Sequence, residues 1–349
     1  MIEKVKEYYV LGIMSGTSLD GLDLAYCYFE YNKVWKFKII KSTTIKYSNY
    51  WKNTLAKTHL KDNYEIKEID KKFGIFIANE ANKFIKKKKI NFISCHGHTI
   101  FHEPNKKINL QIGNGKTIAE ITNKTVINDF RTLDISLNGE GAPLVPIGDL
   151  YLFKKYKYCV NLGGFANISI KQNNSIVAFD ICPVNIILNH ISNKLGKEYD
   201  KNGRIAKKGV LINKLFKDLN NIIFYKNKPP KSLSREWVEK EVLKLINNKM
   251  KLNDVLHTLC EHIAFQIGNL LKCSTTLITG GGVFNNYLID RIKYHSTSKI
   301  IIPNNEIINS KEALIFGFLG VLKIRNEINC LKSVTGARKN SCGGIIHTP

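Results

Sequence analysis

The segment that most constrains this chain is a turn rich in glycine and hydroxyl side chains near its N-terminus. It spans Gly12–Asp23 and links two expected strands, Tyr8–Met14 and Leu22–Tyr28. Glycine lets the backbone approach a bulky anion, and hydroxyls and backbone N–H groups donate to phosphate oxygens. The turn is therefore either a phosphate-binding hairpin or an ordinary glycine-rich turn, because so short a motif does not separate the two.

A similar glycine turn recurs near the middle of the chain. The expected strand Tyr158–Leu162 ends on Gly163 and Gly164 and leads into a second strand, Phe165–Ile170. Repeated β units followed by helices predict two similar α/β lobes with a cleft between them. In such folds ligands bind at the carboxyl ends of strands.

Hydrophobic periodicity and turn residues predict the remaining elements. Further strands are expected at Val34–Ser42, Phe92–Cys95, Ile108–Ile112, Thr125–Asn128, Ser175–Phe179 and Thr275–Ile278. Helices are expected at Ile66–Lys86, Thr117–Thr122, Asn185–Asn193, Asn286–Lys293 and Lys311–Asn326, the last followed by a polar tail. The links between the first three strands are short, which predicts an antiparallel set.

Length and charge limit the classes of function. The 349 residues suffice for roughly two domains. There are 53 Lys and Arg residues against 29 Asp and Glu, a net charge of +24. The excess is mostly lysine and is spread along the chain, whereas base recognition and bidentate phosphate binding favour arginine. We expect solvated lysine surfaces and no nucleic-acid partner.

Cysteine usage and hydropathy indicate the compartment. The eight cysteines include no C-x-x-C pair, and Cys27, Cys95, Cys159 and Cys273 lie in or beside apolar stretches. This pattern predicts reduced core residues rather than disulfides or a zinc site. No signal-peptide pattern is present, and no apolar run reaches the ~20 residues that span a bilayer. We expect a cytoplasmic protein that does not bind membranes.

Polar residues at strand ends are the candidate binding groups of the first half. His96 follows a short strand, and either a substrate hydrogen bond or a purely structural role fits it better than a metal. Arg131, Asp134 and Glu140 follow the next expected strand. Arginine there would bind a carboxylate or phosphate in two-point fashion, or form a surface ion pair.

The second half adds two carboxylates and a glycine triplet. Asp180 follows a strand, as either a general base or the N-cap of the next helix. Gly280, Gly281 and Gly282 separate a strand from a helix and would let an adenine or ribose approach the backbone. Glu312 opens the last helix, where it would favour the helix dipole.

In this order the motifs resemble the anhydro-N-acetylmuramic acid kinase family over nearly the whole chain. The matching stretches are Gly12–Asp23, Cys95–Pro104, Gln111–Gly115, Asp129–Pro146, Asn161–Ser169, Asp180–Asn185, Tyr199–Gly209, Thr279–Arg291, Ser310–Gly317 and Val334–Ala337. The resemblance implies an α/β, two-lobed actin-like ATPase fold (sugar kinase, RNase H-like) with a central cleft. We expect the lobes at residues 1–130 and 131–326, with about 327–349 packing back on the first.

The resemblance also implies a reaction. The family uses ATP to open 1,6-anhydro-N-acetylmuramic acid with water and to phosphorylate O6, which yields N-acetylmuramic acid 6-phosphate in cell-wall recycling. The cofactors would be ATP and Mg²⁺, and the partners an amino sugar and ATP, with a homodimer left open. The alternatives are a kinase of the same fold for another amino sugar and a non-catalytic nucleotide-binding protein.

The family match assigns expected roles to individual residues. Asp180 would take a proton from the attacking water, and Asp20 would bind Mg²⁺. The sugar side would comprise His96, Arg131, Asp134, Glu140 and Glu312. The ATP side would comprise Gly16, Thr17, Ser18, Leu19, Asp20, Gly21, Leu22, Asp23, Asn161, Gly163, Gly164, Gly280, Gly281 and Gly282.

The chain departs from the family pattern in three motifs. The usual Asp-Thr-Gly-Pro-Gly-Asn is Asp-Ile-Cys-Pro-Val-Asn at 180–185, so that Cys182 and Val184 replace glycines beside the expected base. The usual His-Gly-Gln-Thr has His98 in place of Gln, and the usual Lys-Ser-Thr-Gly-Arg-Glu has Leu233 and Ser234 in the middle. The expected base, Pro183 and Asn185 are kept, so we expect an active kinase.

Overall fold

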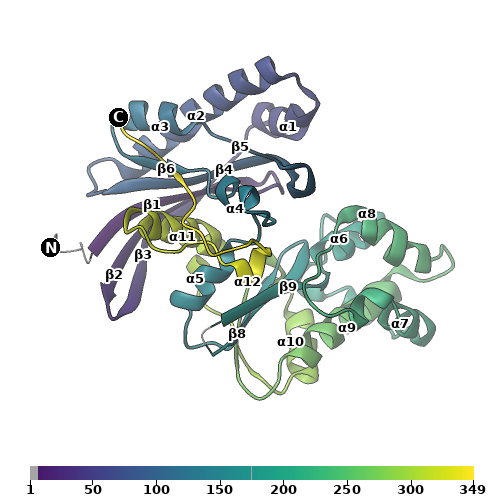
Figure 1. Cartoon of the computed structure of the whole chain (residues 1–349). Coiled ribbons are helices and arrows are strands. Elements are labelled where there is room, and N and C mark those ends of the chain that lie inside the picture. The colour runs from purple at the N-terminus through teal and green to yellow at the C-terminus, as the bar shows by residue number, and fades with distance from the viewer. Residues whose placement is uncertain (1–6, 174) are drawn as a thin grey trace. The chain divides into compact units, whose positions relative to one another are not determined.

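A computed structural model describes residues 7–173 and 175–349, which divide into two α/β units. One unit comprises the chain up to Leu152 together with Ser310–Pro349, and the other is Phe153–Asn309 (Figure 1). These divisions differ from the boundaries expected at 130 and 326. Helix α5 (Val145–Tyr151) belongs with the first unit because its Asp149 pairs with Lys311, 2.7 Å apart.

The first unit is built on a seven-stranded mixed sheet of order β12-β6-β4-β1-β2-β3, with β5 paired to β4. Strands β1, β2 and β3 are antiparallel, as expected, and β4 runs parallel to β1. The strands are β1 (Glu7–Ser15), β2 (Gly21–Asn32), β3 (Val34–Lys46), β4 (Phe92–Glu103), β5 (Ile108–Ile112), β6 (Val126–Asn128) and β12 (Ile345–His347).

Side chains along β1 point alternately to the two faces of this sheet, and α2 packs on one face and α11 on the other. Leu11 and Ile13 pack in a core with residues of α2. Gly12 points the other way, where a Cβ would lie 2.0 Å from the carbonyl oxygen of Ala313 on α11, so only glycine allows this approach. The helices are α1 (Asn49–Lys57), α2 (Asn63–Ile85), α3 (Gly115–Thr122), α4 (Thr132–Ser136), α5, α11 (Asn305–Ile324, most of it in this unit) and α12 (Lys332–Thr335).

The second unit has a five-stranded sheet of order β11-β10-β7-β8-β9. Its strands are β7 (Tyr158–Leu162), β8 (Phe165–Gln172), β9 (Ser175–Pro183), β10 (Thr275–Thr279) and β11 (Lys299–Ile301). Its helices are α6 (Asn185–Lys194), α7 (Asn213–Asn220), α8 (Arg235–Trp237), α9 (Leu252–Leu270) and α10 (Asn286–His295). Apolar residues of β7–β9 and of α6, α7, α9 and α10 share one core.

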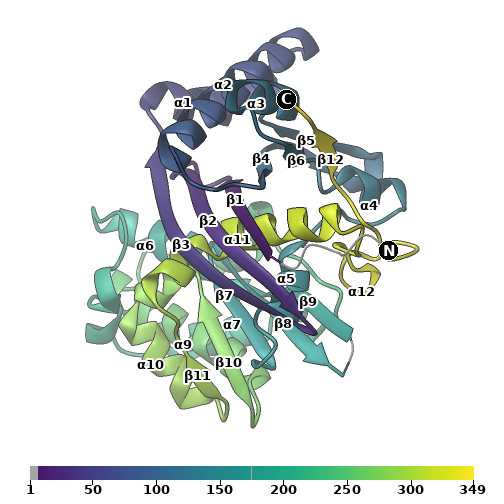
Figure 2. The same ribbon diagram turned by 90° about the vertical axis from the view of Figure 1, so that its left-hand side faces the viewer.

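The two sheets repeat one strand order. Three antiparallel strands are followed by two strands parallel to the first, as β3-β2-β1-β4-β6 in one unit and β9-β8-β7-β10-β11 in the other. Figure 2 shows the three long antiparallel strands of the first unit side by side. The predicted α/β fold class is confirmed.

Several local expectations were wrong. Helix α11 begins at Asn305 rather than Lys311, so Glu312 lies well inside the helix and cannot serve its N-terminal dipole. Strand β9 continues to Pro183 and contains Asp180, while the N-cap of α6 is Val184. The expected polar tail contains α12 and the strand β12, which pairs with β6.

The cysteines follow the expectation with one exception. Cys27, Cys95 and Cys159 are buried and unbridged, whereas Cys273 is exposed and therefore is not a core residue. In the described part of the chain, no helix combines the length and apolar character needed to cross a membrane.

Candidate active site

The tip of the first hairpin is open on the side where a ligand would approach. Thr17, Ser18 and Asp20 are exposed, and the nearest atom to a Cβ built on Gly16 is Ser18 Oγ at 3.6 Å. Glycine at position 16 is therefore not required by packing within the protein. Leu22, in contrast, is fully buried, so only its backbone is available to a nucleotide.

Two other members of the expected phosphate turn have structural constraints. Gly21 pairs with β3, and a Cβ there would lie 2.5 Å from the carbonyl oxygen of Ile45. Leu19 has a φ of 59°, in the left-handed region, and its N–H donates to the carbonyl oxygen of Gly16 at 3.3 Å. The turn is thus a tight, locally hydrogen-bonded loop.

The turn also brings two carboxylates together. Asp23 is half-buried and accepts a hydrogen bond from the Thr44 hydroxyl at 2.5 Å. Burial raises the pKa of Asp23, the Thr44 bond lowers it, and the negative charge of Asp20 raises it further. Among the described residues, no group of three or more His, Cys, Asp or Glu side chains is arranged to hold a metal ion.

A buried polar cluster lies directly behind this turn. The Tyr47 hydroxyl donates to Ser15 Oγ at 2.6 Å, and Ser15 Oγ is 2.8 Å from His98 Nδ1. Burial lowers the pKa of His98 to about 4, so its ring is neutral at pH 7. The departure from Gln to His98 thus places a neutral ring beside Ser15, the last residue of β1.

Arg131 lies in a network with His96. Its Nε and one terminal nitrogen lie 3.0 and 2.9 Å from His96 Nε2, and the other terminal nitrogen donates to the Gly141 carbonyl at 2.7 Å. The second His96 nitrogen is 3.0 Å from the carbonyl oxygen of Gly97. Burial and the Arg131 charge keep the pKa of His96 well below its ordinary value, so the neutral ring accepts from Arg131.

The acidic residues expected on the sugar side are placed differently from one another. Glu140 and Glu312 are exposed, whereas Asp134 is 1% exposed and bonded only to protein groups. Protein replaces much of the water around Glu312 and raises its pKa, as does Asp23, while Lys311 and Arg131 oppose the rise. Asp23, Arg131 and Glu312 therefore interact electrostatically within one unit.

Asp180 lies at an irregularity in β9. Asn167 pairs with Asp180 while Ala166 pairs with Cys182, so Ile181 is an extra residue. Such bulges redirect neighbouring side chains and often lie beside active sites. Asp180 Oδ2 accepts from the Leu233 N–H at 2.9 Å, and within the described chain no group donates to Oδ1. Burial raises the pKa of Asp180 and the Leu233 bond lowers it.

The residues that replace the family glycines beside Asp180 lie in the core. Cys182 and Val184 are both fully buried and pack with the sheet and helices of the second unit. Burial keeps the pKa of the Cys182 thiol far above its ordinary value, so the thiol stays protonated. The two side chains fill the core behind the strand and leave Asp180 accessible.

The glycine turns of the second unit lie next to each other. Asn161 on β7 pairs with Thr279, the last residue of β10, and Gly280 follows directly. Gly280 has a φ of +87°, and a Cβ there would lie 2.7 Å from Asn161 Oδ1. At Gly281 a Cβ would have no atom nearer than 4.0 Å. Gly163 and Gly164 follow β7 and accept from the backbone N–H groups that open α6.

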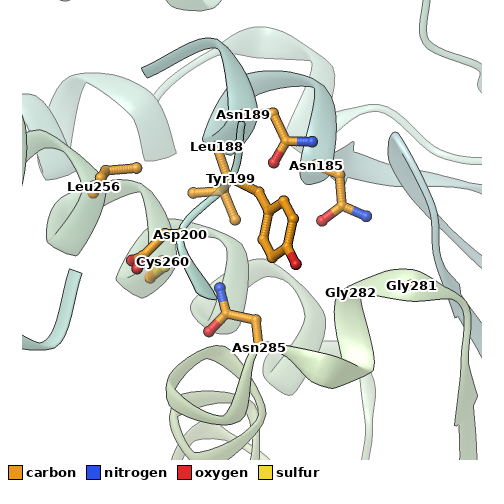
Figure 3. A pocket seen from close by; sticks show the side chains of 10 residues that line it. All are labelled: Asn185, Leu188, Asn189, Tyr199, Asp200, Leu256, Cys260, Gly281, Gly282 and Asn285. Carbon is orange, nitrogen blue, oxygen red and sulfur yellow. The ribbon is translucent and has the colours of Figure 1, made fainter. Parts of the chain in front are cut away.

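A pocket in the second unit opens beside the glycine triplet. Figure 3 shows the Tyr199 ring among the amide side chains of Asn185, Asn189 and Asn285, with the backbone of Gly281 and Gly282 along one side. The remaining lining residues are Leu188, Asp200, Leu256 and Cys260. A flat aromatic ring and several amides suit a ligand that is itself flat and carries donors and acceptors.

The sequence did not identify most of these lining residues as a site. Asp200 is committed to the loop that forms the pocket wall, since its two oxygens accept from the N–H groups of Ile205 and Ala206, each at 2.9 Å. Asn285 caps α10 by accepting from Leu288 N–H at 3.0 Å. The available signals were the family-like stretches Asp180–Asn185, Tyr199–Gly209 and Thr279–Arg291, which contain, besides the two glycines, four of the lining residues: Asn185, Tyr199, Asp200 and Asn285.

Comparison with known proteins finds sequence matches that extend over nearly the whole chain. The family model for anhydro-N-acetylmuramic acid kinase matches residues 8–349. A protein of that name from Bacillus cereus (strain G9842) is 31% identical, with 98% of this chain and 99% of the relative covered. Its counterpart from Francisella tularensis subsp. novicida is 32% identical, with 98% and 100% covered.

Similarity to solved structures is more distant. An activator of 2-hydroxyisocaproyl-CoA dehydratase from Clostridium difficile, with bound ADPNP, is 12% identical with a TM-score of 0.45, covering 91% of this chain and 97% of that one. The family assignment rests on the sequence matches, which extend over nearly the full length. The chain therefore belongs to the anhydro-N-acetylmuramic acid kinase family and is a kinase.

Proposed function

We propose that this kinase uses ATP to convert 1,6-anhydro-N-acetylmuramic acid into N-acetylmuramic acid 6-phosphate. Water attacks the anomeric carbon, its proton passes to Asp180, and the bond from that carbon to O6 breaks. O6 then attacks the γ-phosphorus, and the bond to the bridging oxygen breaks to release ADP. Water is a poor nucleophile toward an acetal carbon, so a positioned base is needed.

The observation that carries this proposal is the placement of Asp180. One carboxylate oxygen is held by the Leu233 N–H and the other is unbonded within the described chain, so the group is oriented and can still accept a proton. Burial raises its pKa, which strengthens it as a base. Its position inside β9 argues against the alternative role as a helix cap.

Each unit by itself contains groups that suit part of an ATP molecule. The hydroxyls and N–H groups of Gly16–Ser18 would bind phosphate oxygens, because they are exposed and nothing fills the space above Gly16. The Tyr199 pocket beside Gly281 would take the adenosine, because its ring and amides match a flat heterocycle. Asn161, Gly163 and Gly164, in the same unit as that pocket, are the further residues that we expect to contact ATP.

Mg²⁺ fits the first hairpin but needs the nucleotide to complete its ligand set. Mg²⁺ typically binds one or two carboxylates together with phosphates and waters. Asp20 and Asp23 supply two carboxylates on one turn, and their mutual repulsion, which contributes to the raised pKa of Asp23, would be relieved by a cation. The ion would supply neutralisation of phosphate charge.

The accessible sugar-side groups are Arg131, Glu140 and Glu312, and we propose that they bind the amino sugar. Arg131 remains a cation, since burial lowers its pKa only to about 10. It would pair with the substrate carboxylate. The reaction would serve the reuse of cell-wall fragments in the cytoplasm, where ATP is available.

The proposed function is tested with purified protein, Mg-ATP and 1,6-anhydro-N-acetylmuramic acid, with the product identified by mass. The expected product is the 6-phosphate of the opened sugar. A parallel reaction with N-acetylglucosamine and N-acetylmannosamine distinguishes a kinase of another amino sugar. Phosphorylation of those sugars but not of the anhydro sugar would contradict the proposal.

A further inference from the structure

Asp134 is a buried carboxylate whose bonding is complete without a ligand. Its Oδ1 accepts from the Thr335 hydroxyl at 2.9 Å and from the Cys330 thiol at 3.1 Å. Its Oδ2 accepts from the Gly141 N–H at 2.9 Å. A Cβ at Gly139 would lie 2.1 Å from Oδ2, so the chain closes tightly over the carboxylate.

These bonds fix the backbone of one residue, Gly141, in the loop that precedes α5. The N–H of Gly141 is held by Asp134, and its carbonyl accepts from Arg131 at 2.7 Å. Gly141 also has a φ of +66°, where other residues are strained. The two peptide groups that flank the Cα of Gly141 therefore link the buried carboxylate to the guanidinium, and movement at one would displace the other.

The C-terminal segment, residues 327–349, supplies the remaining contacts to Asp134 and Glu140. Thr335, on α12, donates its hydroxyl to Asp134, and its carbonyl accepts from the Glu140 N–H at 2.8 Å. The backbones of Cys330 and Ser341 pair in an isolated antiparallel β-bridge, which joins two parts of the segment. Glu140 is thus bonded directly to Thr335 of α12. Arg131 is bonded to the carbonyl of Gly141, whose N–H is bonded to Asp134.

We propose that Asp134 and Thr335 are positioning residues that set the backbone at Glu140 and Gly141, and through it the side chains of Arg131 and Glu140, for the amino sugar. The Asp134 carboxylate is 1% exposed, and both of its oxygens already accept hydrogen bonds from protein donors, so it is not available to bind a sugar. His96 acts on the same guanidinium from the opposite side. The C-terminal segment is accordingly part of the sugar site, an inference that rests on the proposed function.

The test compares Thr335→Val with Thr335→Ser. Valine keeps the shape and removes the donor to Asp134, whereas serine keeps the hydroxyl. The matched control is Thr122→Val, which removes another buried hydroxyl of the same unit that bonds only within α3, to the Ile118 carbonyl at 2.7 Å. All variants are assayed well below their melting temperatures.

Thr335→Val is expected to raise the KM for the anhydro sugar roughly tenfold, about the value of one hydrogen bond, with the KM for ATP unchanged. Thr335→Ser should restore the wild-type KM, and Thr122→Val should alter neither constant. Equal changes in the two KM values, or no recovery with serine, would overturn the proposal, since a disturbance that is not confined to the sugar site would act on both substrates.

Amide hydrogen exchange at Gly141 supplies a readout that does not depend on catalysis. Exchange of this N–H in the full chain should be roughly tenfold faster in Thr335→Val and faster still in Asp134→Asn, and unchanged in Thr122→Val. Unaltered exchange in both site variants would refute the positioning role. If the wild-type protein phosphorylates no anhydro sugar, the proposed function fails, while this exchange measurement still decides whether Asp134 and Thr335 hold the backbone at Gly141.

Discussion

Asp23 in the first unit and Asp180 in the second are both half-buried carboxylates on strands of sheets with the same strand order. They differ in their neighbours. Asp23 accepts from a side-chain hydroxyl, and a second carboxylate adds to its raised pKa. Asp180 is held by a backbone N–H, and burial is the only cause that raises its pKa.

This difference suits the two carboxylates to different tasks. A pair of acids beside exposed hydroxyls suits a cation and phosphates, whereas a single oriented acid with one open oxygen suits proton transfer. The two sheets have the same strand order. The chemistry of each carboxylate is decided locally, by the turn before Asp23 and by the bulge at Asp180. Function thus follows from the site rather than from the fold.

The largest expected effect on activity comes from replacing Asp180 or Asp23, each in a separate variant, with Asn. Asp180→Asn keeps the shape but cannot accept a proton, so kcat should fall by about 10²–10⁴-fold while ATP still binds. Asp23→Asn can still bond Thr44, and its main effect should be a higher KM for Mg-ATP. Steady-state kinetics with both substrates checks this. Near-normal turnover of Asp180→Asn, or the same change in both variants, would remove the distinction.

A second expected effect concerns glycines that serve a ligand and glycines that serve packing. A Cβ at Gly16 or Gly281 has no neighbouring atom closer than 3.6 Å, so each valine variant should fold and yet lose the rise in melting temperature caused by Mg-ATP. Gly12→Ala places a Cβ 2.0 Å from the Ala313 carbonyl and should lower the melting temperature without ligand. Thermal unfolding with and without Mg-ATP measures both. An undiminished ATP shift in the Gly16 and Gly281 variants would contradict the nucleotide assignment.

The smallest expected effect is a displaced acid limb in the pH profile. A base works only when it is deprotonated, and burial raises the pKa of Asp180, so activity should be lost at a higher pH than an ordinary Asp would give. The profile of kcat/KM for the sugar measures this. Below that pKa the value should fall about tenfold per pH unit. The same acid limb in Asp180→Asn would assign the titration to another group.

The repeated fold could be predicted from the sequence because its signals are local. Glycine turns between alternating strands marked both hairpins, and the predicted strands Tyr8–Met14 and Tyr158–Leu162 occur as β1 and β7. Helix α11 was predicted to start too late, at Lys311, because the polar residues of its first turns lack the apolar periodicity of the remainder.

Other features depend on contacts between distant parts of the chain. Asp134 meets Thr335 and Cys330, about two hundred residues further along. The bulge that holds Asp180 arises from pairing with β8, and the Leu233 N–H comes from a separate loop. No spacing within one motif reports such contacts, so the sequence indicated the candidate residues without showing how they are held.

The most direct test of the central claim, that Asp180 activates water for ring opening, is the reaction run in ¹⁸O-labelled water with immediate quenching and mass analysis of the product. We expect one heavy oxygen on the anomeric carbon of the sugar phosphate and none in the phosphate group, and in Asp180→Asn the same labelling at a much lower rate. A product without label, or label only in inorganic phosphate, would contradict the account.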